Sequence, residues 1–318
     1  MKTIPVSIII PNYNGEEILH RTLTSTIQAS HAYPDKTEII VVDDASKDGS
    51  LDLISQFPQI RILRHGVNKG FAEAVHTGVN GSVYDVILLL NSDVMLQQSS
   101  ILPLVQWFEW KETFCVGPLI CNEEGRPARV SWGLSKILRG EIRKCNWDLE
   151  DAIGATANGT PLKSLYASGG SMAFRKDMFL ALGGFCSIYK PFYYEDCDLG
   201  TRGWQRGWKT FFEPRSKVIH GHQGTINRFF AATNIKRIKR RNRFFYLWLH
   251  LSPGKLIFSH LPWTLLRFLS RVLTMDIAYV LGLFAALYST GKIIKLRSKF
   301  VQEHGKRSLE TIIRQIQC

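Results

Sequence analysis

The stretch EIIVVDDASKDGS, residues 38–50, joins a short apolar run to a cluster of acidic and small polar residues. A run of Ile and Val this short is typical of a buried β-strand, and the Asp, Ser and Gly after it are typical of a turn. The same order recurs at VSIIIPNYNG, residues 6–15, and at VILLLNSDV, residues 86–94, with a shorter apolar run, RIL, at 61–63. Longer amphipathic stretches separate these runs, so the sequence predicts an α/β fold in which helices flank a mostly parallel central sheet.

Polar side chains follow three of the four expected strands. In open parallel sheets, ligands bind beyond the carboxyl ends of the strands. The sequence therefore predicts a binding site built from Asn12, Asp43, Asp44, Asn91 and Asp93. For any one of these residues a place in a turn or a helix cap is the simpler interpretation, and the repetition at three strand ends favours a shared site.

Two glycine-bearing stretches indicate further elements. NKGFAEAVHTGV, residues 68–79, predicts a helix flanked by Gly70 and Gly78, whose first N–H groups can face an anion. SGGSMAFRKDMFLALGGF, residues 168–185, predicts a strand, then a helix that begins near Lys176 or Asp177, then a stop at the glycine pair. The segment between them, at about 120–165, receives no assignment beyond an irregular excursion over the acceptor side.

Three carboxylates stand close together in FYYEDCDLGTRGW, residues 192–204, namely Glu195, Asp196 and Asp198. Like charges this close raise one another's pKa, which suits general base chemistry. Asp198 precedes Arg202 by four residues, and at helical spacing the two predict an ion pair. The alternative is that all three carboxylates only favour a helix N-terminus through its dipole.

The positive charge lies almost entirely in the C-terminal part. Residues 221–318 hold 17 Lys+Arg and 3 Asp+Glu, whereas residues 1–220 hold 23 and 24, so the net charge of +13 is the sum of +14 in the tail and −1 in the rest of the chain. Six of the eight residues 236–243 are basic and aromatic residues follow, which is typical of an amphipathic helix attracted to anionic lipid. We expect peripheral attachment to an anionic membrane surface, and no nucleic-acid partner, because no nucleic-acid motif accompanies the charge.

A membrane span is the less favoured alternative. The apolar run IAYVLGLFAALY, residues 277–288, is 12 residues long, whereas a spanning helix needs about 20. Extending the run towards the N-terminus includes Asp276, which is costly at the centre of a bilayer. The tail is therefore expected to lie on the bilayer or dip into it.

Several classes of protein lack their usual motifs here. No G-x-G-x-x-G follows the first strand and no G-x-x-x-x-G-K-[ST] occurs, which disfavours a Rossmann dehydrogenase or a P-loop protein. A sugar-nucleotide pyrophosphorylase would need a glycine-rich basic loop where PNYNGEE stands. The six cysteines show neither C-x-x-C nor zinc spacing, so we expect reduced thiols and a cytoplasmic protein at the inner face of the membrane.

The order of these motifs over about residues 4–225 resembles the family 2 glycosyltransferases, inverting enzymes of the GT-A fold, and among them the rhamnosyltransferase-like members. The resemblance implies a GT-A domain over residues 1–226 and a basic helical extension over residues 227–318. It is carried by six stretches: VSIIIPNYNG, EIIVVDDASKDGS, NKGFAEAVHTGV, LLLNSDV, SGGSMAFRKDMFLALGGF and YYEDCDLGTRGWQRGWKTFFEPRSKVIHGH. The Q-x-x-R-W motif of processive synthases is absent, because RGWK follows Gln205, which implies one sugar added per encounter.

The resemblance also implies roles for individual residues. It makes Asp196 the base that activates an acceptor hydroxyl, while Glu195 either hydrogen-bonds the acceptor or orients the loop. It implies a divalent cation, Mg²⁺ or Mn²⁺, held by Asp93 and His220, with His222 as the alternative histidine. The family's D-x-D motif corresponds here to Asn91-Ser92-Asp93, and the neutral Asn91 predicts weaker metal binding.

A nucleotide-diphosphate sugar of the dTDP, UDP or GDP class is the implied donor, and a glycan or lipid-linked hydroxyl is the implied acceptor. Asp44 is the stronger choice of the two adjacent acids for holding base and ribose. The alternative is a non-catalytic nucleotide-sugar-binding or scaffolding subunit in which Asn91 marks a decayed metal site. The implied donor contacts are Pro11, Asn12, Asn14, Asp43, Asp44, Lys69, Gly70, Asn91, Ser92, Gly169 and Gly170.

Overall fold

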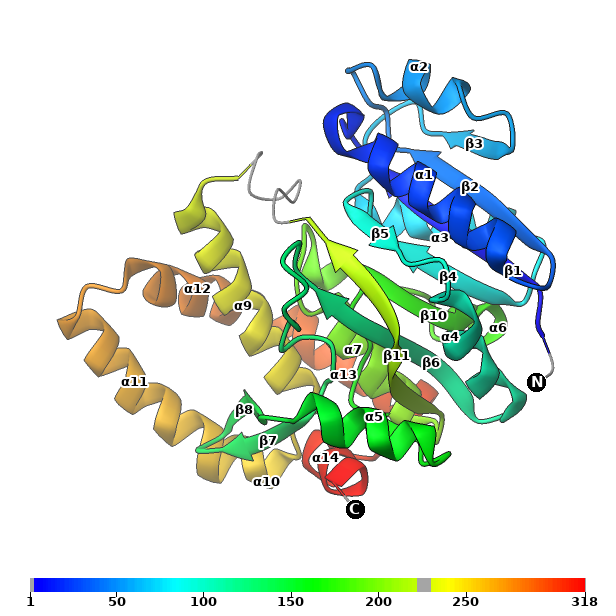
Figure 1. Cartoon of the computed structure of the whole chain (residues 1–318). Coiled ribbons are helices and arrows are strands. Elements are labelled where there is room, and N and C mark those ends of the chain that lie inside the picture. Colours follow the sequence, from blue (N-terminus) through cyan, green and yellow to red (C-terminus); the bar gives the residue numbers. More distant parts are fainter. Residues whose placement is uncertain (1–2, 222–229, 318) are drawn as a thin grey trace.

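The structure is a computed structural model that describes residues 3–221 and 230–317 (Figure 1). Four parallel strands form one half of its large sheet, in the order β3-β2-β1-β4, and confirm the strands expected from the sequence. β1, β2 and β4 are mostly aliphatic and buried, as expected for strands covered on both faces, whereas the edge strand β3 buries only Ile60. These strands are β1 (Val6–Asn12), β2 (Thr37–Asp43), β3 (Ile60–Arg64) and β4 (Val86–Leu90).

The second half of the sheet is mixed. β10 runs antiparallel between β4 and β6, β11 runs parallel to β6, and both β5 and β9 pair antiparallel with β11. The long β11 therefore carries the chain back to the sheet edge where β4 ends. These strands are β5 (Val94–Leu96), β6 (Thr113–Cys121), β9 (Leu162–Ser164), β10 (Ser171–Arg175) and β11 (Lys209–His220).

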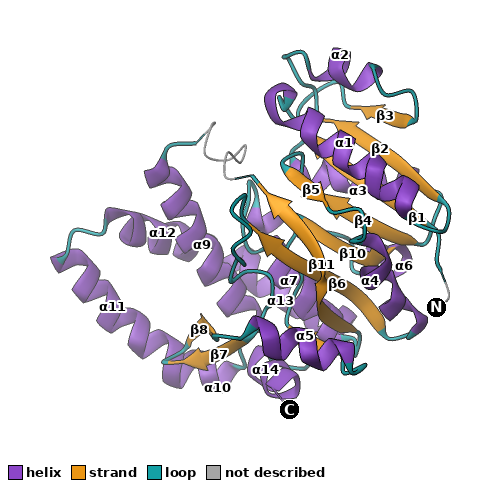
Figure 2. Cartoon of the chain, viewed as in Figure 1, coloured by secondary structure: helices purple, strands orange, loops and turns teal. Residues whose placement is uncertain are grey.

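Helices cover both faces of the sheet (Figure 2). One buried cluster joins α1 and α4 to one face, and another joins α3, α6 and α7 to the other. The short α2 follows β2, with Asp48 accepting from the Ser50 N–H at 3.1 Å. These helices are α1 (Glu16–Ala32), α2 (Ser50–Ser55), α3 (Phe71–Gly81), α4 (Ile101–Val105), α6 (Lys176–Ala181) and α7 (Glu195–Gln205).

The helix after Gly70 is confirmed, but the expectation that Gly78 marks its end is wrong. α3 continues through Gly78, where a Cβ would lie 2.5 Å from a methyl carbon of Ile9. The glycine therefore allows the helix to approach the sheet closely.

Residues 120–165 are more regular than the sequence indicates. They contain a two-stranded hairpin of β7 (Ser135–Leu138) and β8 (Glu141–Lys144), the helix α5 (Leu149–Ala157), and β9. Figure 1 shows the hairpin below the sheet, beside the C-terminal helices.

The C-terminal part is helical, as expected. α9 has the expected apolar face, but Ile238, Phe245 and Leu249 are buried within the protein, so this face does not lie on a bilayer as the sequence predicts. Its aromatic half shares a buried cluster with Trp204 of α7 and Tyr166. The remaining elements are α10 (Pro253–Lys255), the π-helical η3 (Leu256–His260), α11 (Leu261–Leu273), α12 (Ile277–Tyr288), α13 (Thr290–His304) and α14 (Leu309–Gln317), after α9 (Ala232–His250).

Within residues 3–221 and 230–317, no single helix is both long enough and apolar enough to cross a bilayer. α12 and α13 reach the necessary length and apolar character only together, and the two helices are bent by 64° relative to each other.

Candidate active site at the strand ends

The ends of β1 and β2 are joined by side-chain hydrogen bonds. Asn12 donates from Nδ2 to Oδ1 of Asp43 at 3.1 Å, and the other oxygen of Asp43 accepts from the Ser46 N–H at 3.1 Å. Asn14 accepts from the Lys47 N–H at 2.8 Å. The two turns after these strands thus form one unit, as the sequence predicts.

Asp44 is buried, and its carboxylate holds the loop before α3. Oδ1 receives His65 Nδ1 at 2.7 Å and the Lys69 N–H at 2.8 Å, while Oδ2 receives the Gly70 N–H at 2.7 Å. The N–H groups expected to face an anion therefore face Asp44. His65 was missed in the sequence, although it directly follows β3 and so stands at the fourth strand end.

The glycine pair before β10 lies between the N-S-D turn and the acidic segment. Gly170 accepts from the Asn91 N–H at 2.8 Å, and a Cβ on Gly170 would lie 3.1 Å from Asn91 Nδ2. Gly169 donates its N–H to Oδ2 of Asp196 at 3.2 Å. Ser92 is buried, and its carbonyl accepts from the Thr22 hydroxyl at 2.9 Å. The structure thus brings Asn91 and Asp196 to opposite sides of two adjacent glycines.

Asp93 and His220 also lie together. The pairing of β5 with β11 sets His220 opposite Val94, and its Nε2 lies 3.4 Å from Oδ1 of Asp93. The hydrogen bond to Asp93 raises the pKa of His220, and partial burial opposes that rise. His222 lies outside the described residues.

This pair suits a divalent cation that takes its other ligands from a substrate. Within residues 3–221 and 230–317, no group of three or more His, Cys, Asp or Glu side chains gathers to form a metal site. Mg²⁺ is commonly held by one or two carboxylates together with substrate phosphates, so one carboxylate and one imidazole fit such an ion. The cation must displace the proton that Asp93 favours on His220.

The two adjacent acids at the start of α7 differ in environment. Burial, and after it the charge of Asp196, raise the pKa of Glu195 to about 8. Burial also raises the pKa of Asp196, but the N–H groups of Gly169 and Cys197 and the charge of Lys144 oppose that rise. At neutral pH the carboxyl of Glu195 is therefore mostly protonated, whereas the N–H donors and Lys144 favour the charged form of Asp196.

Comparison with known proteins settles the family. Residues 7–183, more than half of the chain, match the model of Glycosyl transferase family 2. The chain belongs to glycosyl transferase family 2. The membership expected from the sequence motifs is thereby confirmed.

Relatives of this family 2 chain include rhamnosyltransferases, which confirms that part of the resemblance. It is 25% identical over 240 residues to N-acetylglucosaminyl-diphospho-decaprenol L-rhamnosyltransferase of Mycobacterium tuberculosis, covering 67% of this chain and 75% of that relative. It is 27% identical over 230 residues to the O-antigen chain rhamnosyltransferase RfbN of Salmonella typhimurium, covering 69% and 67% of the two chains.

Among solved structures, GalNAc-T7 with UDP, GalNAc and Mn²⁺ is similar, with a TM-score of 0.71 at 18% identity. The alignment covers 99% of this chain and 56% of that one. This likeness confirms the expected GT-A fold.

Asp198 has a structural role in this family 2 protein. It is fully buried and accepts from Arg202 Nε at 2.7 Å, which confirms the predicted ion pair. It also contacts His250 Nε2 of α9 at 2.8 Å and the Tyr189 hydroxyl at 3.2 Å. Burial opposes its ionisation, but Arg202 and His250 outweigh burial and lower its pKa.

Asn242 of α9 holds the turn that leads into α7. Its Nδ2 donates to the carbonyls of Tyr189, Phe192 and Tyr193 at 2.7, 2.8 and 3.0 Å. Tyr193 and Tyr194 have φ of 72° and 77°, a region that costs a non-glycine residue about 1–2 kcal/mol. Contacts from the C-terminal part of this glycosyltransferase thus stabilise a strained turn beside Glu195. Nothing in the local sequence around Asn242 indicates this role.

Proposed function

We propose that this family 2 enzyme transfers one sugar per encounter, with inversion, from a nucleotide-diphosphate donor to a hydroxyl of a lipid-linked or growing glycan. The observation that carries the proposal is the glycine pair that contacts Asn91 on one side and Asp196 on the other. A donor bound along the strand ends would then lie opposite the anionic carboxylate.

In this proposal Asp196 takes the proton of the acceptor hydroxyl as its oxygen attacks the anomeric carbon. The new C–O bond forms while the bond to the diphosphate breaks on the opposite face, which gives inversion. Glu195, protonated at neutral pH, donates a hydrogen bond to the acceptor. Its Oε2 is buried without a hydrogen-bond partner among the described residues, which supports that role.

The donor is proposed to bind along the turns after β1, β2 and β4. Pro11, Asn12, Asn14 and Asp43 form the floor, with Asn91 and Ser92 at the fourth strand. Asp44 acts by holding Lys69 and Gly70 in place, as its three hydrogen bonds to that loop support.

Mg²⁺ or Mn²⁺ is proposed to be held by Asp93 and His220, with Asn91 offering a neutral oxygen nearby. A cation bound there would neutralise charge on the departing diphosphate. The presence of Mn²⁺ with UDP in the GalNAc-T7 structure supports a divalent ion in this fold.

The acceptor is proposed to be membrane-bound, with the enzyme attached to the cytoplasmic face of the membrane. The mycobacterial relative is named for a decaprenol diphosphate substrate and for L-rhamnose, so a rhamnosyl or hexosyl donor is the first to test. The surface of α11 supports attachment, because it exposes a continuous apolar face to solvent. Its exposed members are Leu261, Leu265, Leu266, Leu269, Val272 and Leu273.

The test of the base is Asp196→Asn, assayed with Mn²⁺ and with dTDP-rhamnose, UDP-sugars and GDP-sugars as donors. We expect turnover to fall by about 10²- to 10⁴-fold, since general base catalysis supplies roughly that factor. Donor affinity, measured by calorimetry, should change by less than about twofold, because the backbone contacts of the glycine pair to Asn91 remain. Asp52→Asn, an exposed acid on α2, is the matched control.

Two outcomes contradict the proposal in different ways. Near-normal turnover of Asp196→Asn would show that another group takes the proton. Failure of the unmodified protein to transfer sugar from any donor, with donor binding intact, would favour a non-catalytic binding subunit.

A further inference from the structure

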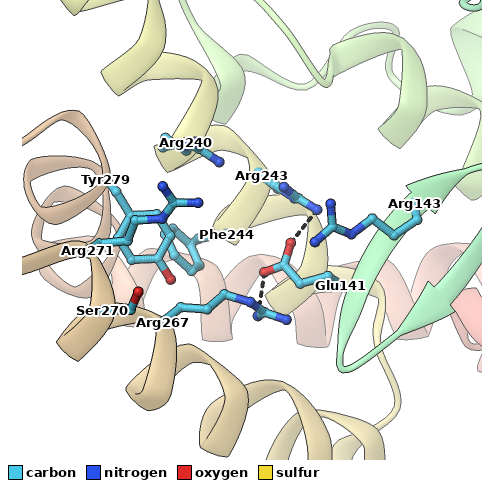
Figure 3. A pocket seen from close by; sticks show the side chains of 9 residues that line it. All are labelled: Glu141, Arg143, Arg240, Arg243, Phe244, Arg267, Ser270, Arg271 and Tyr279. Atoms are coloured by element: carbon cyan, nitrogen blue, oxygen red, sulfur yellow. Dashed lines mark hydrogen bonds and ion pairs between the residues drawn. The ribbon is translucent and has the colours of Figure 1, made fainter. Parts of the chain in front are cut away.

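A cavity of about 320 Å³ lies between the β7–β8 hairpin, α9, α11 and α12 (Figure 3). It is separate from the strand ends that form the proposed donor site. Its lining is dominated by five arginines from three elements, β8, α9 and α11: Arg143, Arg240, Arg243, Arg267 and Arg271.

Two carboxylates do not balance this charge. Glu141 pairs with Arg243 and with Arg267, the latter at 3.0 Å. Asp276 lies 3.4 Å from Arg271 and 3.8 Å from Arg240. Five guanidinium groups against two carboxylates leave an excess of three positive charges around one concavity.

Arg143 is the cation that the protein leaves without an ion-pair partner within the described part of the chain. Figure 3 shows its side chain directed from β8 towards the group around Glu141. Burial and the neighbouring charges of Arg243 and Arg143 lower the pKa of Arg267, as expected where cations crowd one another. Guanidinium groups in such a cluster suit the oxygens of phosphate, which accept paired hydrogen bonds.

The cavity lies close to the proposed base along two elements. On β8, Arg143 lines the cavity, and the next residue, Lys144, places its charge near Asp196. On α9, Lys239 lies 5.0 Å from the centre of the Tyr193 ring, while Arg243, four residues on, lines the cavity. Both elements therefore lead from the cavity to the neighbourhood of the start of α7.

α11 supplies two of these arginines and also carries the exposed apolar face described above. Arg267 and Arg271 of α11 line the cavity, whereas Leu265 and Leu269 are 62% and 54% exposed on another side of the helix. An anion in the cavity that carries an apolar chain can thus continue into a bilayer beside α11. A free phosphate would make no use of this arrangement.

We propose that the arginine cavity binds the diphosphate that joins the acceptor sugar to a polyprenyl chain. This inference rests on the proposed function, because the sugar next to the diphosphate is the one that Asp196 would activate. The two negative charges of a diphosphate diester match an excess of positive charge better than a single phosphate does.

The test uses phosphatidylcholine vesicles with decaprenyl diphosphate, and vesicles with phosphatidylglycerol at the same total charge. Arg143→Gln should weaken binding to the diphosphate vesicles about tenfold or more and leave binding to phosphatidylglycerol vesicles unchanged. Arg314→Gln, which removes one exposed charge from α14, is the matched control and should change neither. Thermal unfolding of Arg143→Gln should match that of the unmodified protein, because no ion pair is lost.

The outcomes separate this inference from the proposed function. Unchanged binding of Arg143→Gln to diphosphate vesicles overturns the inference, and so does equal loss with both vesicle types, which would indicate a general lipid headgroup site. Binding that depends on Arg143, in a protein that transfers no sugar, keeps the cavity assignment and overturns the proposed function. In an active enzyme, Arg143→Gln should raise the acceptor KM about tenfold with the donor KM unchanged.

Discussion

Glu195 and Asp196 are adjacent in the chain but receive unequal support from the backbone. Asp196 accepts from the N–H groups of Gly169 and Cys197 at 3.2 and 2.7 Å, whereas Oε2 of Glu195 is buried without a partner in the described chain. Hydrogen bonds to a carboxylate favour its charged form, and burial disfavours it. The N–H donors therefore favour the charged form of Asp196, whereas burial favours the protonated form of Glu195.

Glu195→Gln should change how stability depends on pH. The unfolded chain releases the Glu195 proton near pH 4.5 and the folded protein near pH 8, so the folded state holds more protons between these values. The free energy of unfolding therefore falls as pH rises through this window, by up to about 1.4 kcal/mol per pH unit from this group. The Glu195→Gln variant lacks that contribution, so its free energy of unfolding should rise relative to that of the unmodified protein from pH 5 to pH 8.

Urea unfolding at several pH values measures this effect. Glu109→Gln, on the exposed surface, should show a constant difference from the unmodified protein over the same range. A constant difference for Glu195→Gln as well would mean that Glu195 is already ionised at neutral pH in the folded protein.

Residue contacts were predictable where spacing alone fixes them. The Asp198–Arg202 pair follows from helical spacing, because residues four apart share one face. His65, Lys144 and Asn242 could not be found this way, since each reaches its partner across at least 20 residues of chain. Their contacts depend on how whole elements pack.

At the scale of elements, the turn before α7 depends on α9. Asn242→Ala would leave the carbonyls of Tyr189, Phe192 and Tyr193 without their buried donor, at a cost of about 1–3 kcal/mol in unfolding free energy. The strained turn would relax and displace Asp196, so kcat should fall about tenfold while the donor KM stays unchanged. Kinetics with varied donor, together with thermal unfolding, measure both effects.

Asn234→Ala, at the exposed start of α9, is the matched control and should change neither quantity. A variant Asn242→Ala that loses stability but keeps full kcat would limit Asn242 to a role in folding.

Helices and strands could be predicted where their apolar residues recur with a single clear spacing. The first four strands and α9 follow from continuous or helical spacing of apolar residues. The β7–β8 hairpin has short strands with few apolar residues, so its sequence carries little periodic signal. The end of α3 was wrongly predicted at Gly78 for a different reason, because a glycine can indicate either a helix end or a close helix–sheet contact.

Across the whole molecule, exposed apolar residues and excess positive charge gather in the same C-terminal helices. We expect Leu269→Glu, at a position already 54% exposed, to preserve the fold and weaken binding to phosphatidylglycerol vesicles about tenfold or more. Cosedimentation with vesicles measures the change, and binding by the unmodified protein should also weaken as salt is raised. Val83→Glu, at a 70% exposed position beside β4, should have no effect.

Equal loss in the Leu269→Glu and Val83→Glu variants would show that added negative charge, and not the apolar face of α11, governs attachment. Binding unaffected by Leu269→Glu would place the membrane contact on another surface.

Asp198 is shared between Arg202 of its own helix and His250 of α9. Chimaeras that graft the tail of a relative onto this strand-end site must therefore retain a partner at position 250. Without it, a buried carboxylate keeps only its helical arginine and the neighbouring tyrosine. The C-terminal helices and the strand-end region can thus diverge only together, as one inherited unit.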